Sequence, residues 1–295
     1  MHFFRSKTSI GLDIQPDEIR LLQLRSAGKQ LSATAAAVMP LPEGAVIEGQ
    51  IQQPDTVRQC LKHLIQHTQT AGKTVTIALP AQCVISKKIQ LSADLEAAAL
   101  VAEIDDNLSN YFPGTQGLAY DYAPLNTDTI LLVAARDEQL IATVNVVEQA
   151  GLKVKCMDVD VYALTHAVEF SIDQCNRSQL IAFVDMNDPV AQLIIAYHNE
   201  ILFHRQLRNK TIPEICSQIQ FGLQFCYNHC VKIDIQKIYL SGSAAILSTA
   251  IESQLSIPTE YINPFEKMSY PPELATHFEK MLLCCGLALR RGALD

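Results

Sequence analysis

The stretch "SIGLDIQPDEIRLLQL", Ser9 to Leu24, decides the fold of this 295-residue chain. A short apolar run ends in one carboxylate, Asp13, and a second apolar run follows a polar turn. Runs of this length around a turn predict two paired strands. A carboxylate at the end of such a strand is typical of folds that hold a metal ion or a water near phosphates. Asp13 is therefore the first candidate site residue.

The same pattern returns roughly 170 residues later, where the run at 180–184 ends in Asp185 and a polar turn. The second apolar run and the next hairpin turn follow at nearly equal offsets in both places. Self-similarity of this kind indicates a repeated structural unit. The sequence therefore predicts an α/β protein of two similar βββαβα halves that face each other across a cleft. This is the layout of the actin-like (ribonuclease H-like) fold, which sugar kinases and Hsp70 proteins share.

The predicted first half spans residues 1–177, with its core in 1–80 and 152–177. Apolar periodicity and turn residues place its elements along the chain. Strands are expected at 10–14, 19–24, 31–39, 74–79 and 153–159, and helices at 55–72, with Asp55 as N-cap, and at 162–170. A βαββα insertion at 81–151 interrupts this half. Its strands are expected at 84–91, 119–123 and 130–135, and its helices at 93–111 and 138–151.

The predicted second half spans residues 178–295. Its strands are expected at 180–184, 191–196, 201–206 and 235–240, its helices at 212–230 and 242–255, and a final helix at 274–291 that packs back on the core. The segment at about 208–234 has room for little more than one helix. We therefore expect the fourth subdomain of the fold to be reduced.

Composition excludes several classes of function. The net charge of −8 argues against a broad nucleic-acid-binding surface, which needs clustered Lys and Arg. No stretch reaches the 18 or so apolar residues of a membrane span, and the polar start "MHFFRSKTS" does not resemble a signal peptide. These features predict a cytoplasmic protein that reaches a membrane only through a partner.

Nine cysteines without a CxxC motif predict reduced thiols rather than a disulfide framework. Cys226, His229 and Cys230 share a predicted helix and could suggest zinc, but no second ligand pair follows them at a matching interval. We interpret these thiols as small buried apolar groups. No GxSxG motif indicates a hydrolase, so no catalytic residue is assigned.

Several segments, in this order and spacing, resemble the PilM family, the cytoplasmic actin-like proteins of type IV pilus assembly. They are "GLDIQPDEIRLLQL", "AAAVMPLPEGAVIEGQIQQPDTV", "TIALPAQCVISKKIQL", "VEQAGLKVKCMDVDVYAL", "INPFEKM" and "CCGLALR". The resemblance implies an FtsA-type inserted subdomain and a place at the cytoplasmic face of the inner membrane. It implies as partners the N-terminal cytoplasmic tail of a PilN-like single-span protein and other inner-membrane pilus components, with self-association as a further option.

The resemblance also implies a nucleotide site, with ATP and Mg²⁺ as possible cofactors. Its expected contacts are Asp13, Gln15, Asp185, Asn187, Gly242 and Ser243, and the two aspartates would hold the metal. However, the turns 13–18 and 185–189 lack the glycines that let backbone N–H groups approach phosphate, and each contains a proline. We therefore expect a degenerate site, no resident metal and no enzymatic activity. The alternative is a functional ATP-binding switch or slow ATPase.

The expected binding site for the partner tail is the groove where the chain leaves the first half and enters the insertion. Leu79 and Pro80 would line it, and Lys87 and Lys88 would meet polar groups of an extended tail. The alternative is an ordinary junction between subdomains, filled by its own side chains, with both lysines in solvent.

Overall fold

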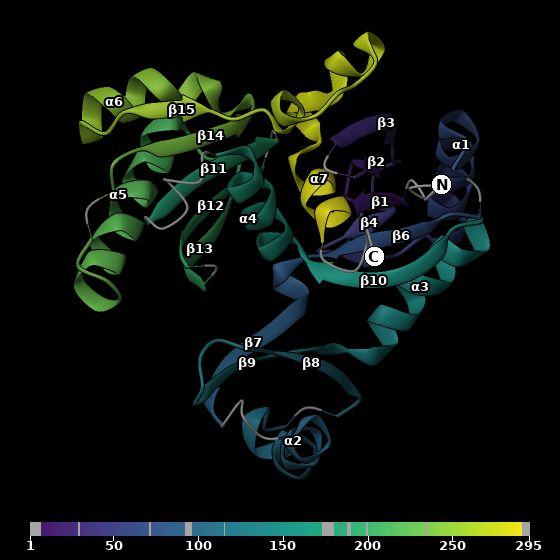
Figure 1. Ribbon diagram of the computed structural model, residues 1–295, viewed down its shortest axis with the longest axis horizontal. Coiled ribbons are helices and arrows are strands. Elements are labelled where there is room, and N and C mark those ends of the chain that lie inside the picture. Colours follow the sequence, from purple (N-terminus) through teal and green to yellow (C-terminus); the bar gives the residue numbers. More distant parts are fainter. Residues whose placement is uncertain are drawn as a thin grey trace.

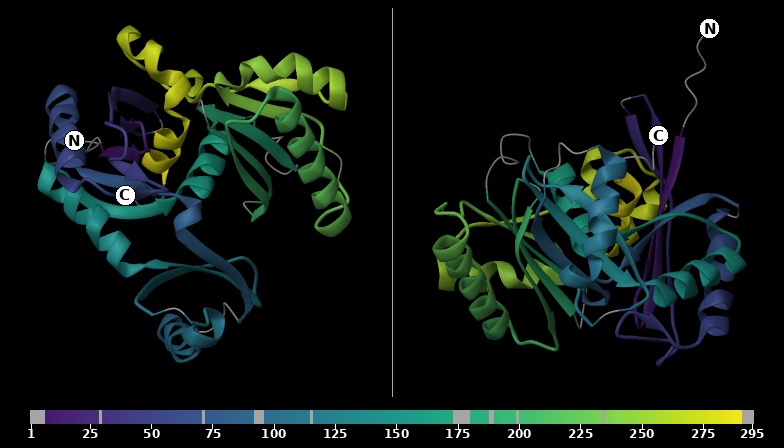
Figure 2. Two further views of the ribbon diagram at one scale, coloured as in Figure 1. Left: turned by 180° about the vertical axis from the view of Figure 1, so that it is seen from behind. Right: turned by 90° about the horizontal axis from the view of Figure 1, so that it is seen from below.

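The computed structural model describes residues 7–290 apart from 29, 71, 92–95, 115, 173–179, 188, 189, 199 and 234. Two lobes, each a sheet with helices, flank a central pair of helices, and a smaller third lobe hangs below them (Figure 1). The view from behind shows the same three-lobed arrangement (Figure 2). The predicted division into two halves and an insertion is therefore visible in the structure.

The first half is a five-stranded sheet in the order β10-β6-β1-β2-β3. Its strands are β1 (Lys7–Ile14), β2 (Glu18–Ala27), β3 (Gln30–Pro40), β6 (Thr74–Leu79) and β10 (Lys153–Val159). The hairpin strands pair antiparallel, whereas β6 is parallel to both β1 and β10. Helices α1 (Pro54–Thr68) and α3 (Asp137–Ala150) bury their apolar sides against the sheet in one core. A short hairpin, β4 (Val46–Ile47) and β5 (Gln50–Ile51), precedes α1.

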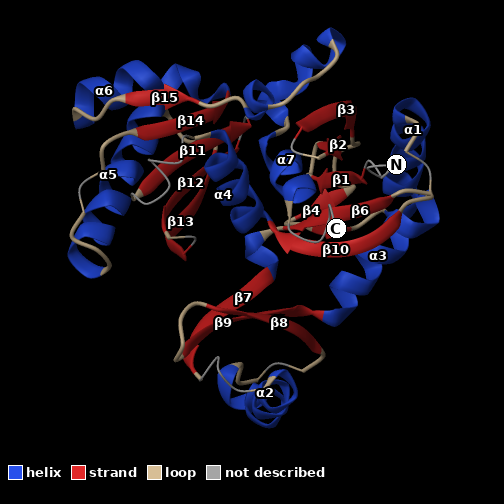
Figure 3. Cartoon of the chain, in the orientation of Figure 1, coloured by secondary structure: helices blue, strands red, loops and turns tan. Residues whose placement is uncertain are grey.

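The second half repeats this topology, with the sheet order β13-β12-β11-β14-β15 (Figure 3). Its strands are β11 (Ile181–Asn187), β12 (Val190–Tyr197), β13 (Glu200–Arg208), β14 (Ile238–Gly242) and β15 (Thr259–Tyr261). Helices α5 (Ile212–His229) and α6 (Ser248–Leu255) pack on it. In both halves the first strand lies centrally, so Asp13 and Asp185 end equivalent strands. Within the described part of 208–234 the chain forms one helix, α5.

The insertion forms a three-stranded sheet in the order β7-β9-β8 that covers helix α2 (Ala97–Tyr111). Its strands are β7 (Val84–Gln90), β8 (Leu118–Pro124) and β9 (Thr129–Arg136). The predicted element order βαββα is confirmed. Its last helix, α3, nevertheless packs on the first half, because Val146, Val147 and Ala150 belong to the first-half core. The start of the predicted helix at residues 93–95 lies outside the described residues.

A third core lies between the halves around helices α4 (Asp160–Ser171) and α7 (Leu282–Leu289). Seven of the eight residues of α7 are buried, as expected for a helix that is apolar all round. Two glycines bring backbones unusually close. A Cβ on Gly286 would lie 1.8 Å from the Ala163 carbonyl oxygen, and one on Gly11 would lie 2.0 Å from that of Cys284. Glycine therefore lets α7 pack directly on both α4 and β1.

Two sequence predictions about helix ends are wrong. The N-cap of α1 is Gln53, and the helix starts with Pro54, whose missing N–H costs nothing at that position, so Asp55 lies inside the first turn. The predicted helix 274–291 is divided: Pro272–Lys280 is a 3₁₀ helix, η5, and α7 begins at Leu282. The break at Met281 lets the chain turn from a partly exposed surface segment into the core between the halves.

Gly286→Ala tests the close approach of α7 and α4. Alanine favours a helix by about 1 kcal/mol over glycine. We nevertheless expect the variant to lower the free energy of unfolding by about 2 kcal/mol or more, because the added methyl overlaps backbone that cannot rotate away. Urea unfolding followed by circular dichroism measures the change. Gly222→Ala in α5 is the matched control, because there the new methyl meets the Phe203 side chain, which can move. Equal costs for both variants would contradict the argument.

Candidate functional site

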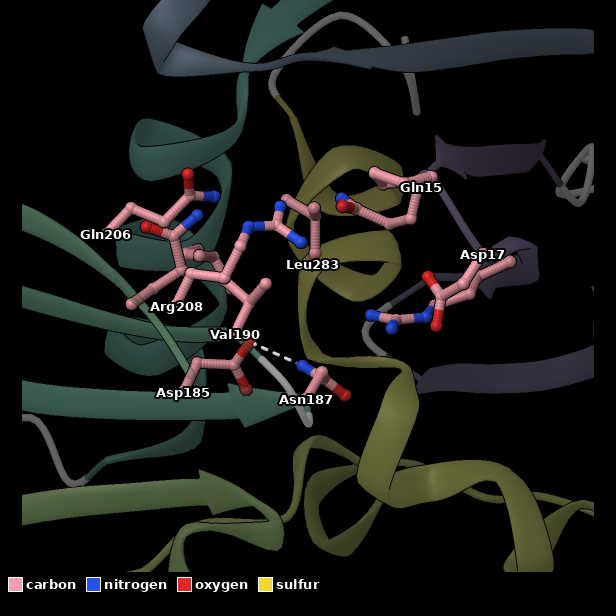
Figure 4. A pocket seen from close by; sticks show the side chains of 12 residues that line it. Gln15, Asp17, Asp185, Asn187, Val190, Gln206, Arg208 and Leu283 are labelled. Atoms are coloured by element: carbon pink, nitrogen blue, oxygen red, sulfur yellow. Dashed lines mark hydrogen bonds between the residues drawn. The ribbon is translucent and has the colours of Figure 1, made fainter. Parts of the chain in front are cut away.

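Polar residues at the ends of β1 and β11 and in the turn after β1 lie at the cleft between the halves. Asp13 and Asp185 are 1% and 4% exposed, and the negative charge of Asp185 is among the causes that raise the pKa of Asp13. Gln15 and Asp17 from the first half face Asp185 and Asn187 from the second (Figure 4). The structure thus brings the predicted aspartates together.

The two halves treat their aspartates in the same way. The Gln15 side-chain amide donates to Asp13 Oδ1 at 2.8 Å, and the Asn187 side-chain amide donates to Asp185 Oδ2 at 2.9 Å. In each turn the carboxamide two residues after the aspartate therefore folds back on it. The expected nucleotide contacts Gln15 and Asn187 instead hydrogen-bond within their own turns.

Arg20 occupies the centre of this polar cluster, and sequence analysis missed it. Its Nε donates to Glu18 Oε1 at 2.6 Å, and its Nη1 lies 3.7 Å from Asp13 Oδ2. Lys280 Nζ binds the other Glu18 oxygen at 2.6 Å. A signal was available in the sequence: in the β1–β2 hairpin register Asp13 lies directly opposite Arg20.

The ionisation of these groups follows from burial and charge. Burial raises the pKa of Asp13 to about 6, against the opposing charge of Arg20. Burial also raises the pKa of Asp185, although Ser241 donates to its Oδ1 at 2.6 Å. For Glu18 burial is outweighed by Lys280 and Arg20, which lower its pKa. The positive charges that act on Asp13 and Glu18 are thus the side chains of Arg20 and Lys280.

The cleft does not fit a magnesium–phosphate group. The Gln15 backbone N–H already donates to the Glu18 carbonyl at 2.9 Å, and Pro16 has no N–H to offer. The cavity has a volume of about 130 Å³, whereas ligand pockets usually span about 300–1,000 Å³. Asp188 and Pro189, which the sequence places in the second turn, lie outside the described residues.

The predicted contacts Gly242 and Ser243 also face protein. A Cβ on Gly242 would lie 2.1 Å from the Met186 carbonyl oxygen, so this glycine serves the packing of β14 on β11. The Ser243 hydroxyl donates to the same carbonyl at 3.1 Å. Their proposed contact with a nucleotide stays a prediction, and the geometry assigns both residues a structural role.

A larger groove of about 560 Å³ lies between the insertion and the rest of the molecule. Seven consecutive residues, 119–125, line it along β8, and Met157 to Val159 line it along β10. Both β8 and β10 are edge strands of their sheets. The groove therefore runs between two strand edges, with the apolar side chains of Leu131 and Val133 on the wall that β9 provides.

Only one of the four residues predicted for the tail site lines this groove. Leu79 does, whereas Pro80 lines a separate cavity of about 160 Å³ near Asp160. Lys87 donates to the Tyr111 carbonyl at 3.3 Å, and Lys88 forms an ion pair with Glu200 of β13. The two lysines lie on opposite faces of β7 because successive strand residues alternate. Lys87 and Lys88 therefore do not form one basic rim beside the groove.

The residues that line the groove come from segments that are far apart in the sequence. Arg290 binds Asp158 Oδ1 at 3.3 Å on its floor, near Tyr162 of α4. One signal was present in the sequence "TILLVAAR" of β9. Its residues are apolar on both faces, and only one face, with Ile130 and Leu132, packs on α2.

The described residues bear on two features, a metal site and a membrane-spanning helix. Among them no group of three or more His, Cys, Asp or Glu side chains could hold a metal ion, and Cys226 is buried while Cys230 is exposed. None of the helices described here is long and apolar enough to cross a membrane.

The sequence matches the family described as Type IV pilus assembly protein PilM over residues 11–209 and 211–292. The chain belongs to the PilM family. A solved structure of a PilM–PilN type IV pilus biogenesis complex matches with a TM-score of 0.80 and 19% identity, and the match covers 97% of this chain and 98% of that chain.

Two further solved structures support the actin-like fold of this PilM-family chain. A Bacteroides thetaiotaomicron protein with an actin-like ATPase fold has a TM-score of 0.52 and 6% identity, with 98% of this chain and all of that chain covered. The cytoplasmic domain of EpsL, an inner-membrane component of the type II secretion system of Vibrio cholerae, has a TM-score of 0.54 and 11% identity over 95% and 94% of the two chains. The predicted fold is confirmed.

Asp160 lies where the insertion, α4 and the cleft meet. It is 4% exposed, and its Oδ1 accepts hydrogen bonds from the Ala81 and Val161 backbone N–H groups at 3.0 and 2.7 Å. Burial raises its pKa to about 7 against these hydrogen bonds, and the negative charges of Asp13 and Asp158 raise it further.

We expect Asp160 to make folding stability fall as the pH rises toward neutral. A carboxyl whose folded pKa exceeds its unfolded value binds its proton more tightly in the folded state, so its contribution is complete below about pH 4 and disappears as the pH passes about 7. One such proton changes the free energy of unfolding by roughly 1.4 kcal/mol per pH unit within that window. Asp160→Asn should flatten the curve of denaturant midpoint against pH. A slope unchanged from wild type would contradict this assignment.

Proposed function

We propose that this PilM-family chain is a cytoplasmic actin-like scaffold of the type IV pilus inner-membrane subcomplex. In this role it binds the N-terminal cytoplasmic tail of a PilN-like membrane protein in the groove between β8 and β10. The observation that supports the proposal best is the groove itself, whose volume of about 560 Å³ contrasts with about 130 Å³ in the cleft. The similar PilM–PilN complex also supports a PilN-like partner.

An extended peptide suits this groove for a physical reason. The outer edges of β8 and β10 end their sheets, and such edges offer backbone N–H and C=O groups to another strand. A tail laid along either edge gains main-chain hydrogen bonds, while its alternate side chains reach the β9 wall at Leu131 and Val133. The ion pair of Asp158 and Arg290 can meet polar groups of the tail. A tail that becomes ordered on binding should bind with moderate affinity.

The partner also explains how such a chain would reach the membrane. A single-span partner would hold the scaffold at the cytoplasmic face of the inner membrane through its tail, and other pilus components could assemble on the same platform. Self-association on that platform is compatible with this role.

Val133→Glu tests the groove. A charge on the apolar wall should weaken binding of a synthetic PilN-like tail peptide by tenfold or more, because the carboxylate must be buried beside apolar side chains of the peptide. Isothermal titration calorimetry gives the affinity. Lys87→Glu is the matched control: it adds the same side chain to the inserted sheet but on the face that packs toward α2. Equal weakening by both variants would move the site elsewhere, and no binding to the wild-type protein would remove the tail as partner.

We also propose that the nucleotide site is degenerate. Titration of the wild-type protein with Mg-ATP should give no saturable binding heat and no rise in melting temperature. The donors that phosphates need are missing or already used: Pro16 has no N–H, the Gln15 N–H donates to the Glu18 carbonyl, and Arg20 is paired with the Glu18 carboxylate. Micromolar affinity would instead favour the alternative function, an ATP-dependent switch of the same complex.

A further inference from the structure

We infer that Arg20 is the resident cation of the cleft, and that its guanidinium balances the carboxylates that a divalent metal would otherwise balance. This inference rests on the proposed degenerate nucleotide site, and it explains why that site would need no metal ion. It makes Arg20 a positioning residue that pairs with Asp13 and whose charge also acts on Asp185.

The first argument is the charge balance of the cleft. Three carboxylates, Asp13, Glu18 and Asp185, are each less than a tenth exposed. Buried carboxylates that are not neutralised repel one another and are costly to keep ionised. Arg20 is 6% exposed, and Lys280 binds Glu18 from a half-exposed position. Arg208 of β13 lines the same cavity but is exposed to solvent. Arg20 is therefore the buried positive charge next to the aspartates.

The second argument is the placement of Arg20. It comes from β2, directly opposite Asp13 in the hairpin register. Its carbonyl oxygen accepts from the Cys284 thiol at 3.4 Å, which ties this part of β2 to α7. Its guanidinium borders the cleft together with Asp185 of the other half. Burial raises the pKa of Asp185 and the positive charge of Arg20 opposes that rise, so one side chain acts on carboxylates from both halves.

The third argument is the state of Asp13. Its Oδ1 accepts from Gln15, but its buried Oδ2 has no hydrogen-bond partner, and Arg20 Nη1 lies 3.7 Å away. This oxygen is balanced by the nearby positive charge rather than by a directed bond. A bare, buried carboxylate oxygen is also a ligand that Mg²⁺ or Ca²⁺ accepts readily. The oxygen should therefore become available to a metal once the guanidinium is removed.

The experiment compares the melting temperatures of full-length variants with and without MgCl₂ or CaCl₂. Wild type should show no change with either metal. Arg20→Gln should melt about 5–15 °C lower at pH 8, because it leaves the buried carboxylates unbalanced. Added Ca²⁺ or Mg²⁺ should restore part of that loss.

Two further variants separate this role from a merely structural one. The double variant Arg20→Gln/Asp13→Asn should recover stability at pH 8 and lose the response to metal, because it removes the unbalanced charge. Lys280→Gln, which removes a half-exposed cation from Glu18, should melt within a few degrees of wild type and ignore metal. If Arg20→Gln is destabilised but neither metal nor Asp13→Asn restores it, the inference is overturned.

The outcomes also separate this inference from the proposed function. A rise in wild-type melting temperature with Mg-ATP would refute the degenerate site, and the inference with it. A wild type that ignores Mg-ATP, together with an Arg20→Gln variant as stable as wild type, would refute only the role of Arg20.

Discussion

The close packing of helix α7 on backbone from both sides is the constraint on which the rest of the structure depends. At Gly286 the helix meets the Ala163 carbonyl of α4, and at Cys284 its own carbonyl meets Gly11 of β1. These approaches allow one apolar helix to fill the space between the halves, and the core between them forms around it. They also set the distance between the ends of β1 and β11. The contents of the cleft thus depend on two residues that have no side chain.

Much of the architecture could be predicted from the sequence, because strands and repeats leave local patterns. The repeat of Asp13 and Asp185 gave the two halves, and each predicted strand lies in the sheet where the repeat places it. Helix ends were less predictable. The predicted helix 274–291 is divided because the chain turns into the core at Met281. Packing against distant parts of the chain causes this turn, so the local sequence does not predict it. The candidate sites depend even more on distant contacts: Val133, Tyr162 and Arg290 come together only in three dimensions.

Arg20 shows a different kind of omission. Its pairing with Asp13 follows from counting residues across a short turn, so the sequence contained the information. Arg20 lies in strand β2 rather than in the turn, so the absence of glycines from the turn gives no indication of it. The two halves also differ here. Both aspartates accept a hydrogen bond from a neutral carboxamide, but the second half adds the Ser241 hydroxyl, whereas the first adds the Arg20 guanidinium at 3.7 Å. A duplicated site can thus change its chemistry on one side and keep its geometry on both.

The position of α7 along the chain has a consequence for synthesis. This helix follows both sheets in the sequence, yet it lies between them. A ribosome therefore releases both halves before the segment that joins their inner faces. Until then the apolar inner surfaces, including Phe183 and Leu22, lack their cover. Nascent chains of this protein should depend on chaperones that shield such surfaces. The groove between β8 and β10 is also incomplete until then, because Arg290, which follows α7, is one of its lining residues.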